Sequence, residues 1–106
     1  MSADRARIFA ALGDPVRLDL LGRIGAEGQS ISDLARDLPM TRQGATKHLK
    51  VLEAGGLIRS ERRGREVVWH GDPAGLSVAR QALDEIGAGW EQSLLRLKDL
   101  VEGRRP

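Results

Sequence analysis

One helix with both of its end signals constrains the fold more than any other part of the chain. Thr41 is a favoured N-cap residue, and the glycine pair at 55 and 56 stops a helix. Apolar residues recur between them at intervals of four and three: Ala45, Leu49 and Leu52. Such spacing places them on one face of a helix. Gly44 lies in its first turns, where glycine costs about 1 kcal/mol relative to alanine. The segment therefore predicts an amphipathic helix, and the glycine indicates that its outer face has a role other than stabilising the helix.

Similar signals predict two helices before it. The first covers residues 1–12 and has Ile8 on its apolar stripe. The second begins with Asp14 as its N-cap and Pro15 at its first position, and it ends at Gly25 or Gly28.

A short helix and a long helix complete the helical set. The short helix over SISDLARDLP has Ser32 as its expected N-cap and ends at Pro39, so that LPMT forms a tight turn into the next helix. Asp72 and Pro73 repeat the start of a capping residue followed by proline. A long helix is expected from Ala74 to about Val101, where apolar residues step by three and four.

Two strands lie between the glycine pair and the long helix. They are expected over Leu57–Arg63 and Glu66–His70, with Gly64 in a basic turn of sequence RRGR. The order of elements predicts a mainly α fold with a small β-hairpin, a winged helix-turn-helix. We expect one domain over residues 1–106. Its expected parts are a helix-turn-helix at 32–54, a wing at 57–70 and dimerisation helices at 1–12 and 74–101.

Composition narrows the functional classes. The 106 residues include no cysteine, which removes disulfides, thiolate metal sites and thiol nucleophiles. No serine has a plausible histidine and acid, and no glycine-rich phosphate loop is present, so we expect no enzymatic activity. No apolar run is long enough for a membrane span and no signal-peptide core is visible, so a cytoplasmic protein without membrane partners is expected.

The outer face of the amphipathic helix is suited to DNA. Gln can pair with adenine, Arg or Lys with guanine, and a Thr methyl can touch thymine. Gly44 leaves room for a close approach to DNA or to the preceding helix. The alternative is a solvated polar face, but the neighbouring turn and basic hairpin favour DNA. The face carries Arg42, Gln43, Thr46, Lys47 and Lys50.

The chain resembles the ArsR-type winged-helix repressors. The matching segments are ALGDPVRLDLLGRI, SISDLARDLPMTRQGATKHLKVLEAGGLI and RSERRGREVVWHGDPAGL. The resemblance implies a homodimeric repressor of double-stranded DNA, with the recognition helix in the major groove and the wing over the backbone or minor groove. By residue, it implies groove contacts from Thr41, Arg42, Gln43, Thr46 and Lys47, phosphate contact from Lys50, and a wing made by Arg62, Arg63 and Arg65.

Metal-sensing residues of that family are missing. The short helix has no Cys or His, and the last helix has no His. His48 and His70 have no partners at metal-ligand spacing. We therefore expect no metal and no cofactor, a structural or phosphate-positioning role for His48, and a structural or surface role for His70. The inducer and the sign of regulation stay open.

The stripe of the long helix needs a cover larger than this small domain offers. A second copy of the chain is the expected cover, with packing inside one chain as the alternative. Gly87 and Gly89 could allow close helix crossing or a small-molecule pocket. The expected interface residues are Ile8, Phe9, Leu83, Ile86, Trp90, Leu94 and Leu97.

Three other functions compete with a DNA-binding repressor. Winged helices also serve as protein–protein modules, and a small-molecule-responsive regulator could have weak DNA selectivity. RNA binding has little support, because Trp69 is the only aromatic near the basic surface.

Overall fold

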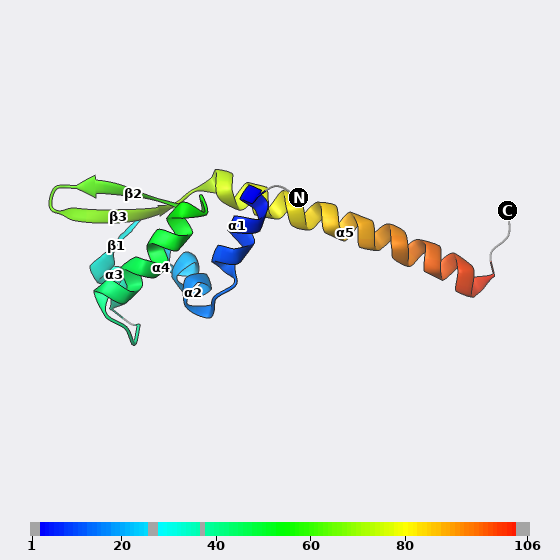
Figure 1. Ribbon diagram of the computed structural model, residues 1–106, viewed down its shortest axis with the longest axis horizontal. Helices are drawn as coiled ribbons and strands as arrows, with labels where there is room; N and C mark the ends of the chain where they lie inside the picture. Colours follow the sequence, from blue (N-terminus) through cyan, green and yellow to red (C-terminus); the bar gives the residue numbers. More distant parts are fainter. Residues whose placement is uncertain (1–2, 26–27, 37, 104–106) are drawn as a thin grey trace.

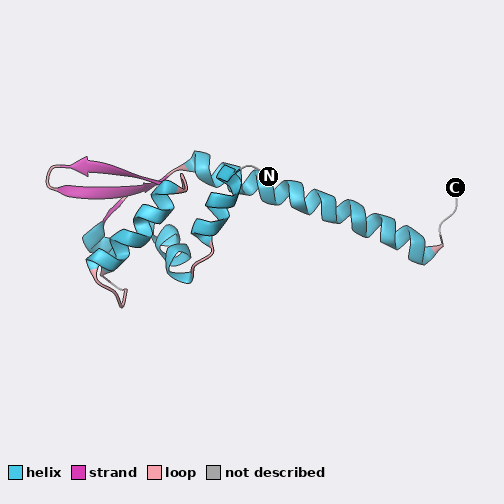
Figure 2. Ribbon diagram, in the orientation of Figure 1, coloured by secondary structure: helices cyan, strands magenta, loops and turns pink. Residues whose placement is uncertain are grey.

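The protein folds into a helical body with a small sheet and one projecting helix (Figure 1). This computed structural model describes residues 3–25, 28–36 and 38–103. The predicted mainly α fold with a β-hairpin is confirmed (Figure 2). In chain order the elements are α1 (Ala3–Leu12), α2 (Pro15–Ile24), β1 (Gln29–Ser30), α3 (Ile31–Ala35), α4 (Arg42–Ala54), β2 (Ile58–Arg63), β3 (Glu66–Gly71) and α5 (Pro73–Glu102).

Three helices begin at the N-caps that the sequence predicted. The Asp14 carboxylate accepts hydrogen bonds from the backbone N–H groups of Val16 at 2.8 Å and Arg17 at 3.1 Å. The Thr41 hydroxyl accepts one from Gly44 at 3.0 Å, and Asp72 caps α5 in the same way. These bonds satisfy N–H groups that have no partner inside the helix.

The expected cap of the short helix was wrong by two residues. Ser30, not Ser32, caps α3, and its hydroxyl accepts from the N–H of Asp33 at 3.2 Å. Ser30 also ends β1, which pairs antiparallel with β3 through the Ser30–Val68 partners. The sheet therefore has three strands, in the order β1-β3-β2, and not the two that the sequence predicted. The extra strand holds Ser30 at the sheet edge, and α3 begins directly after it.

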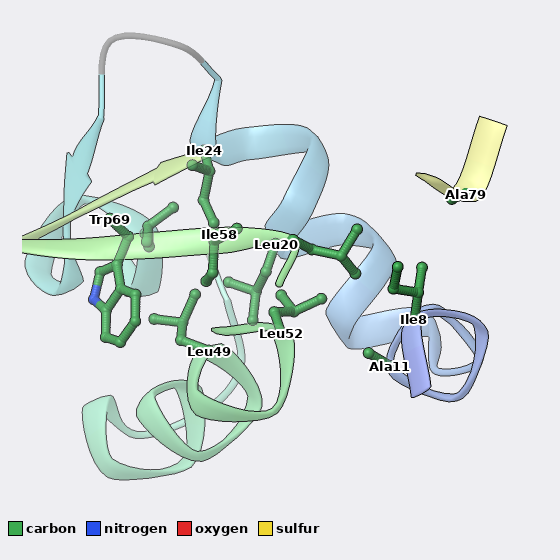
Figure 3. Close-up of a cluster of buried hydrophobic side chains, with 11 residues drawn as sticks. Ile8, Ala11, Leu20, Ile24, Leu49, Leu52, Ile58, Trp69 and Ala79 are labelled. Carbon is green, nitrogen blue, oxygen red and sulfur yellow. The ribbon is translucent and has the colours of Figure 1, made fainter. Parts of the chain in front are cut away.

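The core lies where α2, α3 and α4 meet the inner face of the sheet (Figure 3). Leu49 and Leu52 of α4 are fully buried there, as their spacing predicted, and Trp69 of β3 is only 4% exposed. Ile8 of α1 is also only 4% exposed. Ile8 was expected at the interface with a second chain, and in this protomer its side chain packs in the core.

The start of α5 is fixed to the body, and the rest of this helix projects from it (Figure 1). Gly75 packs so closely that an added Cβ would lie 1.9 Å from the carbonyl oxygen of Gly56. Arg5 of α1 holds Glu85 through two hydrogen bonds of 2.7 and 3.2 Å. The projecting part of α5 gives the protomer a long axis of 69 Å against widths of 26 and 23 Å.

Candidate nucleic-acid interface

A stripe of polar side chains runs along the outside of α4. Gln43, Lys47 and Lys50 are all exposed, at intervals of four and three residues. Burial of Ala45 and Leu49 on the opposite side fixes this orientation. None of the three outer side chains forms a hydrogen bond or ion pair with the described residues, so their donors and acceptors remain available to a ligand.

The two threonines of this face already use their hydroxyl oxygens within the helix. Thr41 accepts from the N–H of Gly44, and the hydroxyl of Thr46 donates to the carbonyl oxygen of Arg42 at 2.8 Å. The Thr41 hydroxyl can still donate its proton to a ligand, whereas the Thr46 hydroxyl already donates its proton within α4.

Arg42 turns away from the axis of α4 and toward α3. Its Nη2 donates a hydrogen bond of 2.6 Å to the Oγ of Ser32. Sequence spacing placed Arg42 at the DNA groove. In the structure its side chain, at the first position of the helix, folds back toward α3. Ser32 was not among the predicted site residues. No pattern in the sequence pairs it with Arg42, ten residues later.

Gly44 has a local role in this arrangement. An added Cβ would lie 3.3 Å from Oγ1 of Thr41 and 4.0 Å from Cβ of Met40. The first contact is tighter than usual van der Waals contact, so a side chain at position 44 would press on the cap of its own helix. The glycine thus fits the cap of α4, which the sequence did not indicate.

The wing carries the predicted arginines at and beside its turn. Glu66 and Arg63 are partners across the turn, and Gly64 adopts a φ of 63°, a left-handed conformation that favours glycine. Arg62 and Arg65 have no ion pair with the described residues. Arg63 instead lies 3.4 Å from the carboxylate of Glu61, which reduces its positive charge toward a ligand.

Glu61 links the wing arginine to a histidine. Its carboxylate lies 2.8 Å from Nε2 of His70 on the neighbouring strand. Hydrogen bonds from Arg63 and then from His70 lower the pKa of Glu61 below its usual value. His70 also lies against Gly28, where a Cβ would be 2.6 Å from its Cε1. His70 thus packs at the base of the wing, between Glu61 and Gly28.

His48 and Trp69 lie on the inner side of the DNA-binding elements. His48 is half-buried near Asp14. The pKa of the Asp14 carboxyl is lowered chiefly by the backbone N–H of Arg17, with smaller contributions from the N–H of Val16 and the Arg17 charge. Trp69 is buried, so it offers no free face for stacking on an RNA base. Among the described residues, no group of three or more His, Cys, Asp or Glu could hold a metal ion.

The long apolar stripe of α5 is uncovered in the protomer. Exposed fractions are 69% for Trp90 and 64% for Leu94. Phe9 of α1 is half-buried and packs on the core. Hollows along α5 lie beside Trp90 and Leu94, and a Cβ added at Gly87 or Gly89 would have open space around it. The other predicted interface residues are exposed as well: Leu83, Ile86 and Leu97.

Comparison with known proteins agrees with this geometry. Residues 12–61 match a family model described as a helix-turn-helix domain. The chain is 34% identical over 101 residues to HTH-type transcriptional regulator Rv2034 of Mycobacterium tuberculosis, across 95% of this chain and 90% of that protein.

Solved structures show the same fold. An ArsR-like transcriptional regulator from Rhodococcus sp. RHA1 superimposes with a TM-score of 0.79 at 40% identity, covering 92% of each chain. A homodimeric winged helix-turn-helix DNA-binding domain from Mycobacterium bovis gives a TM-score of 0.63 at 30% identity, covering 81% of this chain and 79% of that one. In the described part of this chain, no helix is both long and apolar enough to cross a membrane. On this fold, this outer face of α4 and these relatives, the chain belongs to the ArsR-type winged helix-turn-helix family of DNA-binding transcriptional regulators.

Proposed function

We propose that the protein is a homodimeric repressor that binds an inverted repeat of double-stranded DNA near a promoter. The observation that carries this proposal is the outer stripe of α4, where Gln43, Lys47 and Lys50 are exposed and unpaired among the described residues. Helix-turn-helix proteins present such a face to the major groove. Repression follows if the bound dimer occupies the site that RNA polymerase needs.

Some residues of α4 provide sequence choice and others provide affinity. Gln43 can pair with N6 and N7 of adenine, and Lys47 can donate to O6 and N7 of guanine. The Thr46 methyl group remains for contact with a thymine methyl, since its hydroxyl bonds within the helix. Thr41 keeps its hydroxyl proton for a contact in the groove. Lys50 holds a phosphate, and such contacts position the helix and carry no sequence information.

Arginines of the wing add charge along the backbone. Arg62 and Arg65 have no ion pair with the described residues, so their charges are available to neutralise DNA phosphates. Arg63 contributes less, because Glu61 lies beside it. Each phosphate neutralised releases counterions, which makes binding fall as salt rises.

A second copy of the chain covers α5. Exposed apolar stripes of this length are rare on monomers and mark interfaces. The M. bovis relative is a homodimer, which supports the same assembly here. The stripe consists of Leu83, Ile86, Trp90, Leu94 and Leu97. Phe9 of α1, which is half-buried, is proposed to extend the interface. A twofold dimer places two α4 helices in successive major grooves, about 34–36 Å apart.

Regulation in this proposal does not depend on a bound metal. The described residues hold no cluster of three or more metal-ligating side chains, so the proposed cytoplasmic dimer should bind DNA equally well with and without a chelator. The open alternatives are a small-molecule effector, a protein effector, or no effector at all.

Selection from a random duplex library tests the proposed function. The purified protein is bound to the library in the presence of a chelator, and the recovered duplexes are sequenced over several rounds. The proposal predicts an enriched inverted repeat with half-site centres about one helical turn, roughly 10 base pairs, apart. Recovery of unenriched sequence, with protein retained only by charge, would contradict it.

A further inference from the structure

A hollow of about 270 Å³ lies between the helix-turn-helix and the tip of the wing. Arg42 reaches it from the start of α4, Ser32 from α3, and Arg65 from the turn that follows β2. Ile31 and Val67 supply apolar walls. Three separate elements thus bring two guanidinium groups and a hydroxyl to one recess beside the DNA-binding face.

We propose that this hollow binds one phosphate of the DNA backbone, held jointly by Arg42 and Arg65, and that Arg42 does not read a base. The inference rests on the proposed function and deepens it, since it concerns the same DNA-binding face. It replaces the groove contact of Arg42 that sequence spacing implied.

The hydrogen bond from Arg42 to Ser32 is the first argument. At 2.6 Å it turns the guanidinium toward α3 and into the hollow, away from the stripe of Gln43, Lys47 and Lys50. A guanidinium has five N–H donors, and this bond uses one of them. The remaining donors can hold a phosphate in the two-bond geometry that arginine favours. The Ser32 hydroxyl accepts from Arg42, so its own proton is free for a phosphate oxygen.

The chemistry of the other lining groups is the second argument. Arg65 has no ion pair with the described residues, so its charge is available to an anion. Glu66 also borders the hollow and is exposed. Its carboxylate opposes an anion there, which makes the net charge of the lining +1 from two arginines and one glutamate. The hollow therefore suits a group of one negative charge, as a phosphodiester is.

A consequence for DNA binding follows from the shared phosphate. Arg42 belongs to the helix-turn-helix and Arg65 to the wing, so one phosphate bridges both parts. Binding then fixes the wing relative to α4 and sets the position of α4 along the groove. Arg42 and Arg65 are accordingly positioning residues, whereas Gln43 and Lys47 supply the sequence choice.

The salt dependence of DNA binding tests the inference. Fluorescence anisotropy would be measured at several salt concentrations on a duplex recovered by selection. The proteins are wild type, Arg42→Ala, Arg65→Ala, the double variant, and Arg80→Ala as a control that removes one exposed charge from α5. The dimer carries each substitution twice, so for one shared phosphate per chain the double variant lowers the log–log salt slope by about 1.8. Two separate phosphates per chain would lower it by about 3.6 and would overturn the proposal.

Base preference supplies the second readout. Arg42→Ala should weaken binding by about tenfold per chain, the value of a charged hydrogen bond, and so by about a hundredfold for the dimer, on every duplex alike. Its selected sequence should be the same as that of wild type. Glu66→Gln should strengthen binding, because the opposing charge is gone, while Arg80→Ala should match wild type.

The outcomes separate this inference from the function itself. A changed base preference in Arg42→Ala would overturn the inference and leave the repressor proposal standing. The inference would also be overturned, with the repressor proposal left standing, if Arg42→Ala and Arg65→Ala bound DNA no more weakly than Arg80→Ala. Failure of wild type to prefer any selected duplex would instead contradict the proposed function.

Discussion

Replacing Trp90 with alanine should separate the dimer without unfolding the protomer. Trp90 is 69% exposed in the protomer and lies in the middle of the α5 stripe. An aromatic side chain buries roughly 150–250 Å², so covering the exposed part of Trp90 removes about 140 Å² from water. At about 25 cal/mol per Å², and after allowing for the alanine that remains, the loss is about 3 kcal/mol per chain. Two chains lose about 6 kcal/mol, or about 10⁴-fold in the dimer dissociation constant.

Sedimentation equilibrium over a range of protein concentrations measures this change. Leu95→Ala is the matched control, because Leu95 is 62% exposed but lies five residues on, about 140° around the helix from Trp90. Far-UV circular dichroism checks that both variants stay folded. A dissociation constant for Trp90→Ala within tenfold of wild type would refute the α5 interface, as would an equal loss in Leu95→Ala.

Four further substitutions test the local structure and the proposed base contact. Gly75→Ala should destabilise the fold by about 1–3 kcal/mol, since its Cβ would meet the Gly56 carbonyl at 1.9 Å, whereas Gly22→Ala, with open space, should gain about 1 kcal/mol; urea unfolding measures both, and equal midpoints would contradict this. The lowered pKa of Asp14 contributes stability that is present above its unfolded pKa and lost as pH falls through its folded pKa. Asn is also a favoured N-cap residue but does not titrate, so Asp14→Asn should make the free energy of unfolding depend less on pH in the acid range. A pH dependence unchanged from wild type would count against the contribution of Asp14. Gln43→Ala should cost about 1–3 kcal/mol on the selected duplex and relax preference at one base pair in a repeated selection. An unchanged preference would show that Gln43 faces no base.

Helix boundaries were the most predictable part of the fold. Asp14 and Thr41 act as caps because their side chains satisfy N–H groups two or three residues away, a local interaction that sequence spacing describes. The apolar interval from Ala45 to Leu52 likewise defines the buried face of α4. Such signals need no knowledge of the rest of the chain.

Tertiary pairings were not predictable in this way. β1 has only two residues and gains its identity from β3, far along the chain, so it shows no periodicity of its own. Ser30 and Ser32 are equally good caps by residue type, and pairing with β3 decides between them. Ile8 fits the apolar stripe of α1 in sequence, but spacing cannot say whether its own core or a second chain covers it.

The candidate site divides along the same line. The outward direction of Gln43, Lys47 and Lys50 follows from helix periodicity and was predicted. The fold-back of Arg42 onto Ser32 depends on where α3 lies, so sequence spacing left it among the groove residues. The pairing of Arg63 with Glu61 was hidden for a similar reason, because a pattern of basic residues shows charge but not its partners.

Selective binding to DNA is the central claim, and fluorescence anisotropy tests it most directly. A labelled duplex from the promoter region of the protein's own operon is titrated against a scrambled duplex at several salt concentrations, with a chelator present. The account predicts tight, site-selective binding by two chains per duplex and a steep salt dependence that the chelator leaves unchanged. Equal, weak binding to both duplexes would contradict it.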